Sequence, residues 1–319
     1  MLAGGCPALL AGLPAKRILL PNRGGVMELF QHPSTAIWLV PFFVLAIVVE
    51  AILYPRFKGK AYPWRESLLS FIVAIGHGIA GFVNQAVIIG VVGYAVWSLR
   101  IMTMPMDRWW SWVLLFVLEE FAYYWYHRCA HRVRLLWATH AVHHSPDELT
   151  LASSYRLAWT PVLSASWVFF LPVIWIGYHP AAVFGLLSIS LLYQFWLHST
   201  LIPKLGPLEY ILNTPSAHRV HHASNETYLD RNYGGIVIIF DRLFGTYTAE
   251  ADGVTLKYGL VHPQTSNNPL VIVYGEFVNL LRDLVRAENW GDRWRLILMP
   301  PGWVPRESAV EPSKPASSY

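Results

Sequence analysis

Charged residues are scarce in this chain. Asp, Glu, Lys and Arg together make up 14% of its 319 residues, whereas a soluble domain carries about 25%. Hydrophobic residues make up 54% and aromatic residues 14%, and the mean hydropathy is +0.36. This composition excludes an ordinary soluble globular protein and predicts an integral membrane protein.

Cysteine is nearly absent as well. The two cysteines, Cys6 and Cys129, cannot build a disulfide framework. Cys129 lies inside a cluster of histidines, where it is either a soft metal ligand or a small packing residue. The neighbouring imidazoles have better spacing for a metal, which favours packing.

A basic stripe interleaved with exposed aromatic residues is missing too, so we expect no nucleic-acid partner. The formal charge of +4 instead indicates basic loops on the cytoplasmic side of a membrane. Residues 1–26 lack the basic start and continuous apolar core of a signal peptide. We interpret them as a disordered or non-native extension that precedes Met27.

Long apolar runs occupy much of the remaining sequence. They predict about five membrane-spanning or hairpin helices, at residues 37–54, 67–99, 109–126, 161–176 and 181–197. The second run is too long for one simple span. It predicts either one long tilted helix, which we favour, or a hairpin broken around Gly76, Gly78 and Gly81.

The order of these runs predicts which segments share a membrane face. If the basic loop around Arg56 and Lys58 is cytoplasmic, the ends of the 109–126 and 161–197 segments return to that face. We therefore expect an all-α membrane protein with a cytoplasmic helical cap, formed by one domain over residues 27–299. The apolar run at residues 236–244 predicts an interfacial segment. The mixed apolar and charged pattern of residues 270–285 predicts an amphipathic helix, and the Pro and Ser content of residues 300–319 predicts a disordered tail.

Histidine is the residue that stands out. Eight of the thirteen histidines fall in three short clusters with the patterns H-x3-H, H-x2-HH and H-x2-HH. These are His127 and His131; His140, His143 and His144; and His218, His221 and His222. Neutral imidazole is a common ligand of transition metals, so the clusters predict a metal centre at a membrane face.

The spacing within the clusters fits helices. Residues three or four apart lie on one helix face, whereas adjacent residues point about 100° apart. Each HH pair can therefore serve two different ions. His198 ends the predicted hairpin on the same face and is a ninth candidate, and Gln194 lies one turn before it as a weak ligand or hydrogen-bond partner.

Other polar residues have both a functional and a structural interpretation. Glu119 and Glu120 precede His127 by about two helical turns, and Asp147, Glu148, Asp230 and Asp241 follow the second and third clusters. These carboxylates either orient ligands or cap helices and pair with surface charges. Of the single histidines, His32, His179 and His262 indicate surface or turn positions, and His77 is a polar residue within an apolar run.

Eight or nine histidines exceed the three or four ligands of a zinc site and suit a pair of redox metals, for which iron fits imidazole. Apolar helices around such a pair can admit an alkyl chain and exclude water. This setting favours oxidation of a lipid C–H bond by dioxygen.

The histidine series resembles that of the membrane-bound fatty acid hydroxylase/sterol desaturase superfamily. The segments HHSPDELTLASSYR, YQFWLH and NTPSAHRVHHASNETYLDRNYGGIVIIFDRLFGTY resemble the branch that includes alkylglycerol monooxygenase and its bacterial relatives. The resemblance covers roughly residues 110–250. Gln194 stands where some members have a histidine, and Ala217 stands where several have another.

The resemblance implies that two Fe ions are held by the nine candidates, with no catalytic residue beyond these ligands; zinc can replace iron in a purified form. They are His127, His131, His140, His143, His144, His198, His218, His221 and His222. It further implies O2 as co-substrate, a lipid substrate, and electrons from a separate donor or a reduced pterin. The active site would face the cytoplasm, at a bacterial inner membrane or the endoplasmic reticulum.

Three functions are compatible with these observations. The leading one is hydroxylation of an ether lipid or a related alkyl-chain lipid by a di-iron monooxygenase. A sterol- or lipid-type desaturase would use the same histidine cage. A metal transporter or sensor would place its histidines at several membrane depths, and clusters that follow helix ends on one face disfavour it.

Overall fold

The structure is a computed structural model that describes residues 33–262 and 266–305. The extension at 1–26 and the tail beyond residue 305 lie outside the described residues. The described part is helical, with one isolated bridge between Leu212 and Val237. Its α-helices are α2 (Pro33–Lys58), α3 (Trp64–Gln85), α4 (Tyr94–Ser98), α5 (Trp109–Arg132), α6 (Arg134–His144), α7 (Pro161–Ser164), α8 (Leu171–Ile176), α9 (Pro180–Gln194), α10 (Pro215–His222), α11 (Ile239–Leu243), α12 (Pro269–Arg286) and α13 (Trp290–Leu298).

Three helical stretches in the described residues are long and apolar enough to cross a membrane: Val40–Lys58, Trp64–Ser98 and Pro180–His198. The stretch Trp64–Ser98 is the predicted single long helix, since α3 and α4 are joined by a π-helical segment, Ala86–Gly93. The glycines at 76, 78 and 81 do not break it. The prediction of one long helix is confirmed.

Two predicted spans differ from this pattern. The segment 109–126 lies within the continuous helix α5, but this helix buries Glu119 and Glu120 and does not reach the hydropathy of the other three. The segment 161–176 is not one helix. It breaks at Ala165, whose φ of 56° is left-handed, and continues as the 3₁₀ turn Ser166–Phe170 and then α8. A left-handed residue cannot continue a right-handed helix.

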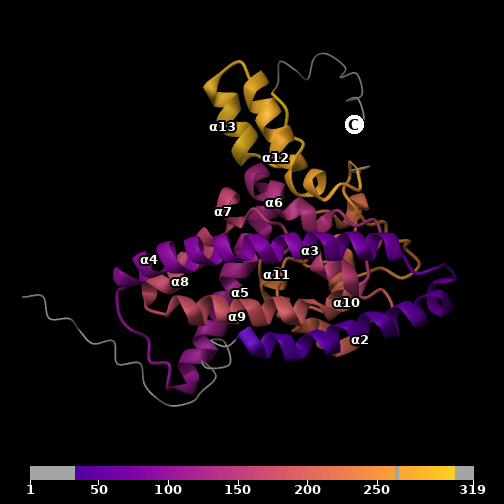
Figure 1. Cartoon of the computed structure of the whole chain (residues 1–319), viewed down its shortest axis with the longest axis horizontal. Coiled ribbons are helices and arrows are strands. Elements are labelled where there is room, and N and C mark those ends of the chain that lie inside the picture. The colour runs from indigo at the N-terminus through magenta and orange to yellow at the C-terminus, as the bar shows by residue number, and fades with distance from the viewer. Residues whose placement is uncertain (1–32, 263–265, 306–319) are drawn as a thin grey trace, which may run out of the picture.

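α2 ends and α3 begins at one end of the molecule (Figure 1). α9 ends beside the middle of α2, where Phe195 packs against Phe43 and Ile47. The 3₁₀ turns Leu151–Tyr155 and Trp196–His198 pack there, and the second of them contacts α10. This arrangement agrees with the prediction that the histidine-bearing segments share one face.

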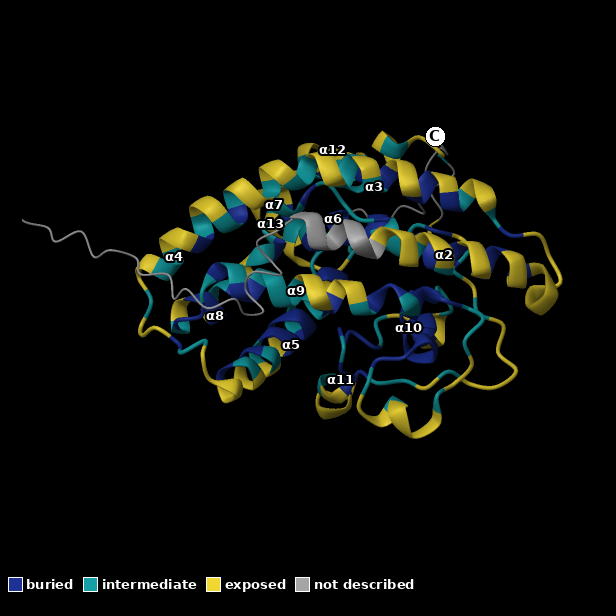
Figure 2. Ribbon diagram, turned by 60° about the horizontal axis from the view of Figure 1, so that its bottom comes forward, coloured by how far each residue is buried: buried dark blue, intermediate teal, exposed yellow. Residues whose placement is uncertain are grey.

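Burial differs sharply between these elements. α10 is almost wholly buried, whereas α2 and α3 expose residues along their outer sides (Figure 2). The exposed residues of α2 and α3 include Phe42, Ile52, Ile75 and Phe82. Large apolar side chains on the outside of long helices are expected where lipid is the solvent.

The predicted amphipathic segment 270–285 forms α12, which buries Ile272 and Val273 against α3 and α6. The predicted interfacial segment 236–244 is helical only over α11, Ile239–Leu243. Asp241 within it is buried and hydrogen-bonds the backbone of Tyr233 and Gly234. These hydrogen bonds join α11 to the segment that precedes it.

Candidate metal centre

The structure brings all nine predicted histidines together in two groups. His127, His131, His140, His144 and His221 form group A, and His143, His198, His218 and His222 form group B. Within each group, one ring nitrogen per residue lies within 4.8 Å of all the others. Three clusters that are far apart in the sequence thus become one site.

The two adjacent-histidine pairs are divided between the groups. In α6, His144 belongs to group A and His143 to group B; in α10, His221 belongs to group A and His222 to group B. The rings of His144 and His222 stack across the boundary with centroids 4.4 Å apart. The prediction that neighbouring histidines point to different positions is confirmed in geometry.

Backbone carbonyls orient several of the rings. Nδ1 of His127 donates to the carbonyl of Tyr233 at 2.8 Å, Nδ1 of His198 to that of Gln194 at 2.9 Å, and Nδ1 of His221 to that of Arg231 at 2.9 Å. A longer contact of 3.4 Å joins Nδ1 of His143 to the carbonyl of Arg156. When Nδ1 carries the proton, Nε2 is an unprotonated acceptor directed at the interior of the group.

The interior nitrogens are crowded in a way that suits a cation. Nε2 of His127 lies 2.9 Å from Nε2 of His140, and Nε2 of His198 lies 3.2 Å from those of both His143 and His218. Nitrogens bound to one ion at about 2.1 Å lie about 3.0 Å apart when adjacent and about 4.2 Å apart when opposite. The spacing in both groups therefore fits a bound ion.

Two more nitrogens support this fit. Nε2 of His131 and Nε2 of His221, both in group A, are buried and have no hydrogen-bond partner among the described residues. A buried polar atom without a partner is costly. A metal ion in group A would satisfy both nitrogens.

Burial keeps these imidazoles neutral. It lowers the pKa of His143 to about 4, and burial together with neighbouring histidines holds the pKa of His140, His144 and His222 well below the usual value. A metal ligand must be the unprotonated imidazole. The site is thus prepared for a cation at neutral pH.

Two of the acidic residues predicted near the clusters contact the histidines or the backbone that orients them. Asp230 lies 3.6 Å from Nδ1 of His131 and 3.2 Å from Nε of Arg132. Asp241 accepts from the backbone N–H groups of Tyr233 and Gly234, both at 2.8 Å. Since the Tyr233 carbonyl receives the His127 proton, Asp241 supports that ligand through one intervening residue.

The neighbouring glutamates of α5 have different environments. Glu120 accepts from the backbone N–H groups of Ile236 and Val237, both at 2.9 Å, and from the hydroxyl of Ser190 at 3.2 Å. Glu119 is fully buried, and both its carboxylate oxygens lack partners among the described residues. Of these two glutamates, only Glu120 forms hydrogen bonds to the loop that follows the third cluster, at Ile236 and Val237.

Several predicted alternatives lie outside the two groups. The amide of Gln194 binds the hydroxyls of Tyr123 and Ser190. Cys129 is a free, half-buried thiol. His77 contacts the carbonyl of Ala158 at 2.7 Å, and His179 caps α9 by accepting from the N–H of Ala181. His32 lies outside the described residues.

Sequence reasoning missed the groups that orient the rings. The carbonyls of Tyr233, Arg231 and Arg156 belong to the main chain, which every residue has. The residue types at these positions therefore do not indicate the contacts. One side-chain signal was available: Asn213 and Asn232 are buried amides that bridge backbone groups around the third cluster.

Comparison with known proteins places this site in a family. Residues 112–246, which contain all nine histidines, match the family model described as Fatty acid hydroxylase. The chain is 33% identical to human alkylglycerol monooxygenase over 288 residues, 89% of this chain and 63% of that protein. The alkylglycerol monooxygenase of Danio rerio is also 33% identical, over 90% of this chain and 64% of its own length.

A bacterial relative is more distant. The ornithine lipid hydroxylase of Rhizobium tropici is 30% identical over 135 residues, 42% of this chain and 41% of that protein. The chain spans less than two thirds of the length of the monooxygenases that it matches. No solved structure matches it significantly. From these matches we conclude that residues 112–246, the histidine-bearing segment, belong to the fatty acid hydroxylase family, and that the similarity to alkylglycerol monooxygenases extends along most of the chain.

Proposed function

We propose that this protein is a membrane-bound, O2-dependent monooxygenase that hydroxylates an ether lipid or a related alkyl-chain lipid. The observation that supports the proposal is the division of nine histidines, eight of them buried and His143 half-buried, into two groups. Two such positions, side by side and joined by stacked rings, suit a pair of ions better than a single one.

The nine histidines are the proposed ligands, five in group A and four in group B. We propose iron as the metal, because nitrogen-rich sites with several imidazoles suit redox-active iron. When bound, the metal pair would supply the reductive activation of O2. One oxygen atom enters a C–H bond and the other leaves as water, so each turnover needs two electrons and two protons from a separate donor or a reduced pterin.

The chain itself would position the lipid and exclude water. The exposed apolar sides of α2 and α3 contact lipid, and the buried segments around α10 close the site from solvent. A dry site protects an oxidant from side reactions. We place the site on the cytoplasmic face of a bacterial inner membrane or the endoplasmic reticulum, because the basic loop with Arg56 and Lys58 lies at the same end.

The enclosed cluster argues against metal transport. A transit path needs ligands at several depths, whereas the rings of groups A and B form one continuous cluster. Product analysis separates hydroxylation from desaturation by the same cage. A hydroxylase adds one oxygen atom to the lipid, and a desaturase removes two hydrogen atoms.

The test is metal content measured by elemental analysis on detergent-purified, iron-reconstituted protein. We expect about two irons per chain. His221→Ala and His222→Ala are a matched pair, because these neighbours belong to different groups. Each variant should retain iron at the undamaged group, and the exposed His262→Ala variant should retain both ions.

Lipid oxidation is then measured with O2 and a reductant. Iron binding without any oxygen transfer to ether lipids or acyl lipids would contradict the proposed reaction. Failure to bind metal after reconstitution would refute the metal centre as well.

A further inference from the structure

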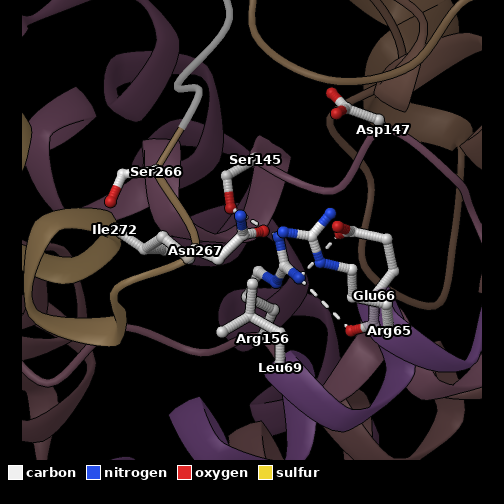
Figure 3. Close-up of a pocket in the computed structure, with 9 residues that line it drawn as sticks. All are labelled: Arg65, Glu66, Leu69, Ser145, Asp147, Arg156, Ser266, Asn267 and Ile272. Atoms are coloured by element: carbon white, nitrogen blue, oxygen red, sulfur yellow. Dashed lines mark hydrogen bonds and ion pairs between the residues drawn. The ribbon is translucent and has the colours of Figure 1, made fainter. Parts of the chain in front are cut away.

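A polar cavity lies beside group B. It has a volume of about 180 Å³ and is formed by four separate segments: the first turns of α3, the loop after α6, the residue after the 3₁₀ turn Leu151–Tyr155, and the start of α12. Its lining includes Arg65, Glu66, Ser145, Asp147, Arg156 and Asn267 (Figure 3). None of these residues belongs to the proposed metal ligands.

A partly buried ion pair between Arg156 and Glu66 lines this cavity. The guanidinium of Arg156, which is only 2% exposed, binds the carboxylate of Glu66 at 2.8 Å and the hydroxyl of Ser145 at 3.1 Å. Its Nε is buried and has no partner among the described residues. A buried guanidinium N–H without an acceptor can donate a hydrogen bond to a ligand oxygen.

Two opposite charges remain available on the cavity wall. Arg65 and Asp147 are exposed residues that line the cavity without a hydrogen bond or close ion pair to any described residue, and Asp147 interacts with Arg156 only through the longer-range attraction of their charges. In Figure 3 the guanidinium groups of Arg65 and Arg156 occupy the middle of the labelled residues, and Asp147 lies apart from them. The cavity wall therefore has positive charge at Arg65 and Arg156 and negative charge at Asp147.

The position of the cavity indicates where its ligand comes from. α3 begins at Trp64 and is part of a membrane-length helix, so its first turn lies where lipid headgroups lie. α12 also begins at the cavity, and the N-termini of helices favour anions. Leu69 and Ile272 add apolar surface that continues into the packed core between α3 and α12.

We infer that this cavity binds a zwitterionic group, with its phosphate on Arg65 and Arg156 and its ammonium on Asp147. A phospholipid with an amine-bearing headgroup presents this pair of charges at the required depth. The same two charges occur in soluble phosphoethanolamine, so the chemistry is shared by a lipid and a free metabolite. Because the Arg156 carbonyl contacts His143, the occupied cavity borders the metal centre directly.

The experiment measures lipid binding by native mass spectrometry on delipidated, detergent-purified protein, both before and after iron loading. Phosphatidylethanolamine is compared with phosphatidylglycerol, which has the phosphate but no ammonium, and with soluble phosphoethanolamine. We expect phosphatidylethanolamine to bind about tenfold more tightly than phosphatidylglycerol, as expected for one additional charge-assisted contact. The inference does not require hydroxylase activity, so metal-free protein should give the same order.

Two variants separate the two charges. Arg65→Gln should weaken both phospholipids about tenfold, whereas Asp147→Asn should weaken only phosphatidylethanolamine and abolish the preference. Lys204→Gln and Asp252→Asn, which neutralise an ion pair elsewhere, are the matched controls and should change nothing. Binding of phosphoethanolamine with the same variant pattern would support the inferred chemistry and identify a soluble ligand.

Equal binding of the two phospholipids to wild-type protein would overturn the inference. A preference that survives Asp147→Asn would overturn it as well, because the ammonium would then be recognised elsewhere.

Discussion

The adjacent glutamates of α5 should respond to substitution in opposite ways. Glu120 is buried and accepts from two backbone N–H groups and one hydroxyl. Replacing it by Ala leaves the buried N–H of Val237 and the half-buried N–H of Ile236 without an acceptor, each at a cost of roughly 1–3 kcal/mol. We therefore expect Glu120→Ala to lower the free energy of unfolding by about 3–5 kcal/mol.

Glu119 is equally buried, yet its oxygens have no partner among the described residues. Glu119→Leu replaces an unpartnered polar group by an apolar one of similar size, a change that is often neutral or stabilising. The pair is a matched comparison, because both substitutions remove one carboxyl from the same turn of the same helix. Melting temperatures of the two variants in detergent give the order directly.

The effect should also reach the metal centre. Glu120 holds the N–H groups of Ile236 and Val237, close after Tyr233, whose carbonyl orients His127. Loss of such outer support typically weakens metal binding 10–100-fold, so Glu120→Ala should lose metal from group A before group B. Equal melting temperatures for Glu120→Ala and Glu119→Leu, or undiminished metal affinity in Glu120→Ala, would refute the reasoning.

Four further outcomes are expected. Asp230→Asn, which weakens the carboxylate contact to His131, should reduce metal affinity at group A about 10–100-fold in a chelator titration and leave group B occupied. Gly235→Ala should destabilise the protein, because the added Cβ would lie 2.8 Å from Ser190 Oγ and 3.1 Å from Glu120 Oε1; a wild-type melting curve would contradict this. Chelation should lower the melting temperature of the wild type, since an ion that binds only the folded state stabilises it, and re-addition of metal should restore it. Burial raises the pKa of the Asp241 carboxyl to about 6, from an ordinary 3.8. The folded state therefore binds a proton at Asp241 more tightly than the unfolded state does. The resulting stabilisation is complete at a pH below 3.8 and is lost as the pH rises through about 6. The stability of wild type relative to the Asp241→Asn variant should therefore fall by about 1 kcal/mol between pH 5 and pH 7, and a difference that stays constant or grows would exclude this titration.

The helical class and the histidine pairing could be predicted because both depend on local periodicity. Residues three or four apart meet on one helix face whatever surrounds them, so the pairing of His140 with His144 and of His218 with His222 follows from spacing alone. The long helix at Trp64–Ser98 is likewise a consequence of a continuous apolar run.

The composition of each group was not predictable in the same way. Group A joins His127 and His131 of α5 to residues of α6 and α10, and that choice depends on tertiary packing. The break at Ala165 also escaped prediction, because alanine favours helix and nothing local signals a left-handed conformation. Whether a buried carboxylate finds partners is a tertiary property too, so sequence could not distinguish Glu119 from Glu120.

The division of each HH pair between the two groups has a consequence for how the site can change over time. The offset between the two positions is set by one step along a helix, repeated in α6 and in α10. The rigid helix backbone thus sets the distance between the two proposed metal positions, and this distance depends little on the surrounding side chains. Side chains around the two groups can therefore change while the spacing of the two positions stays the same.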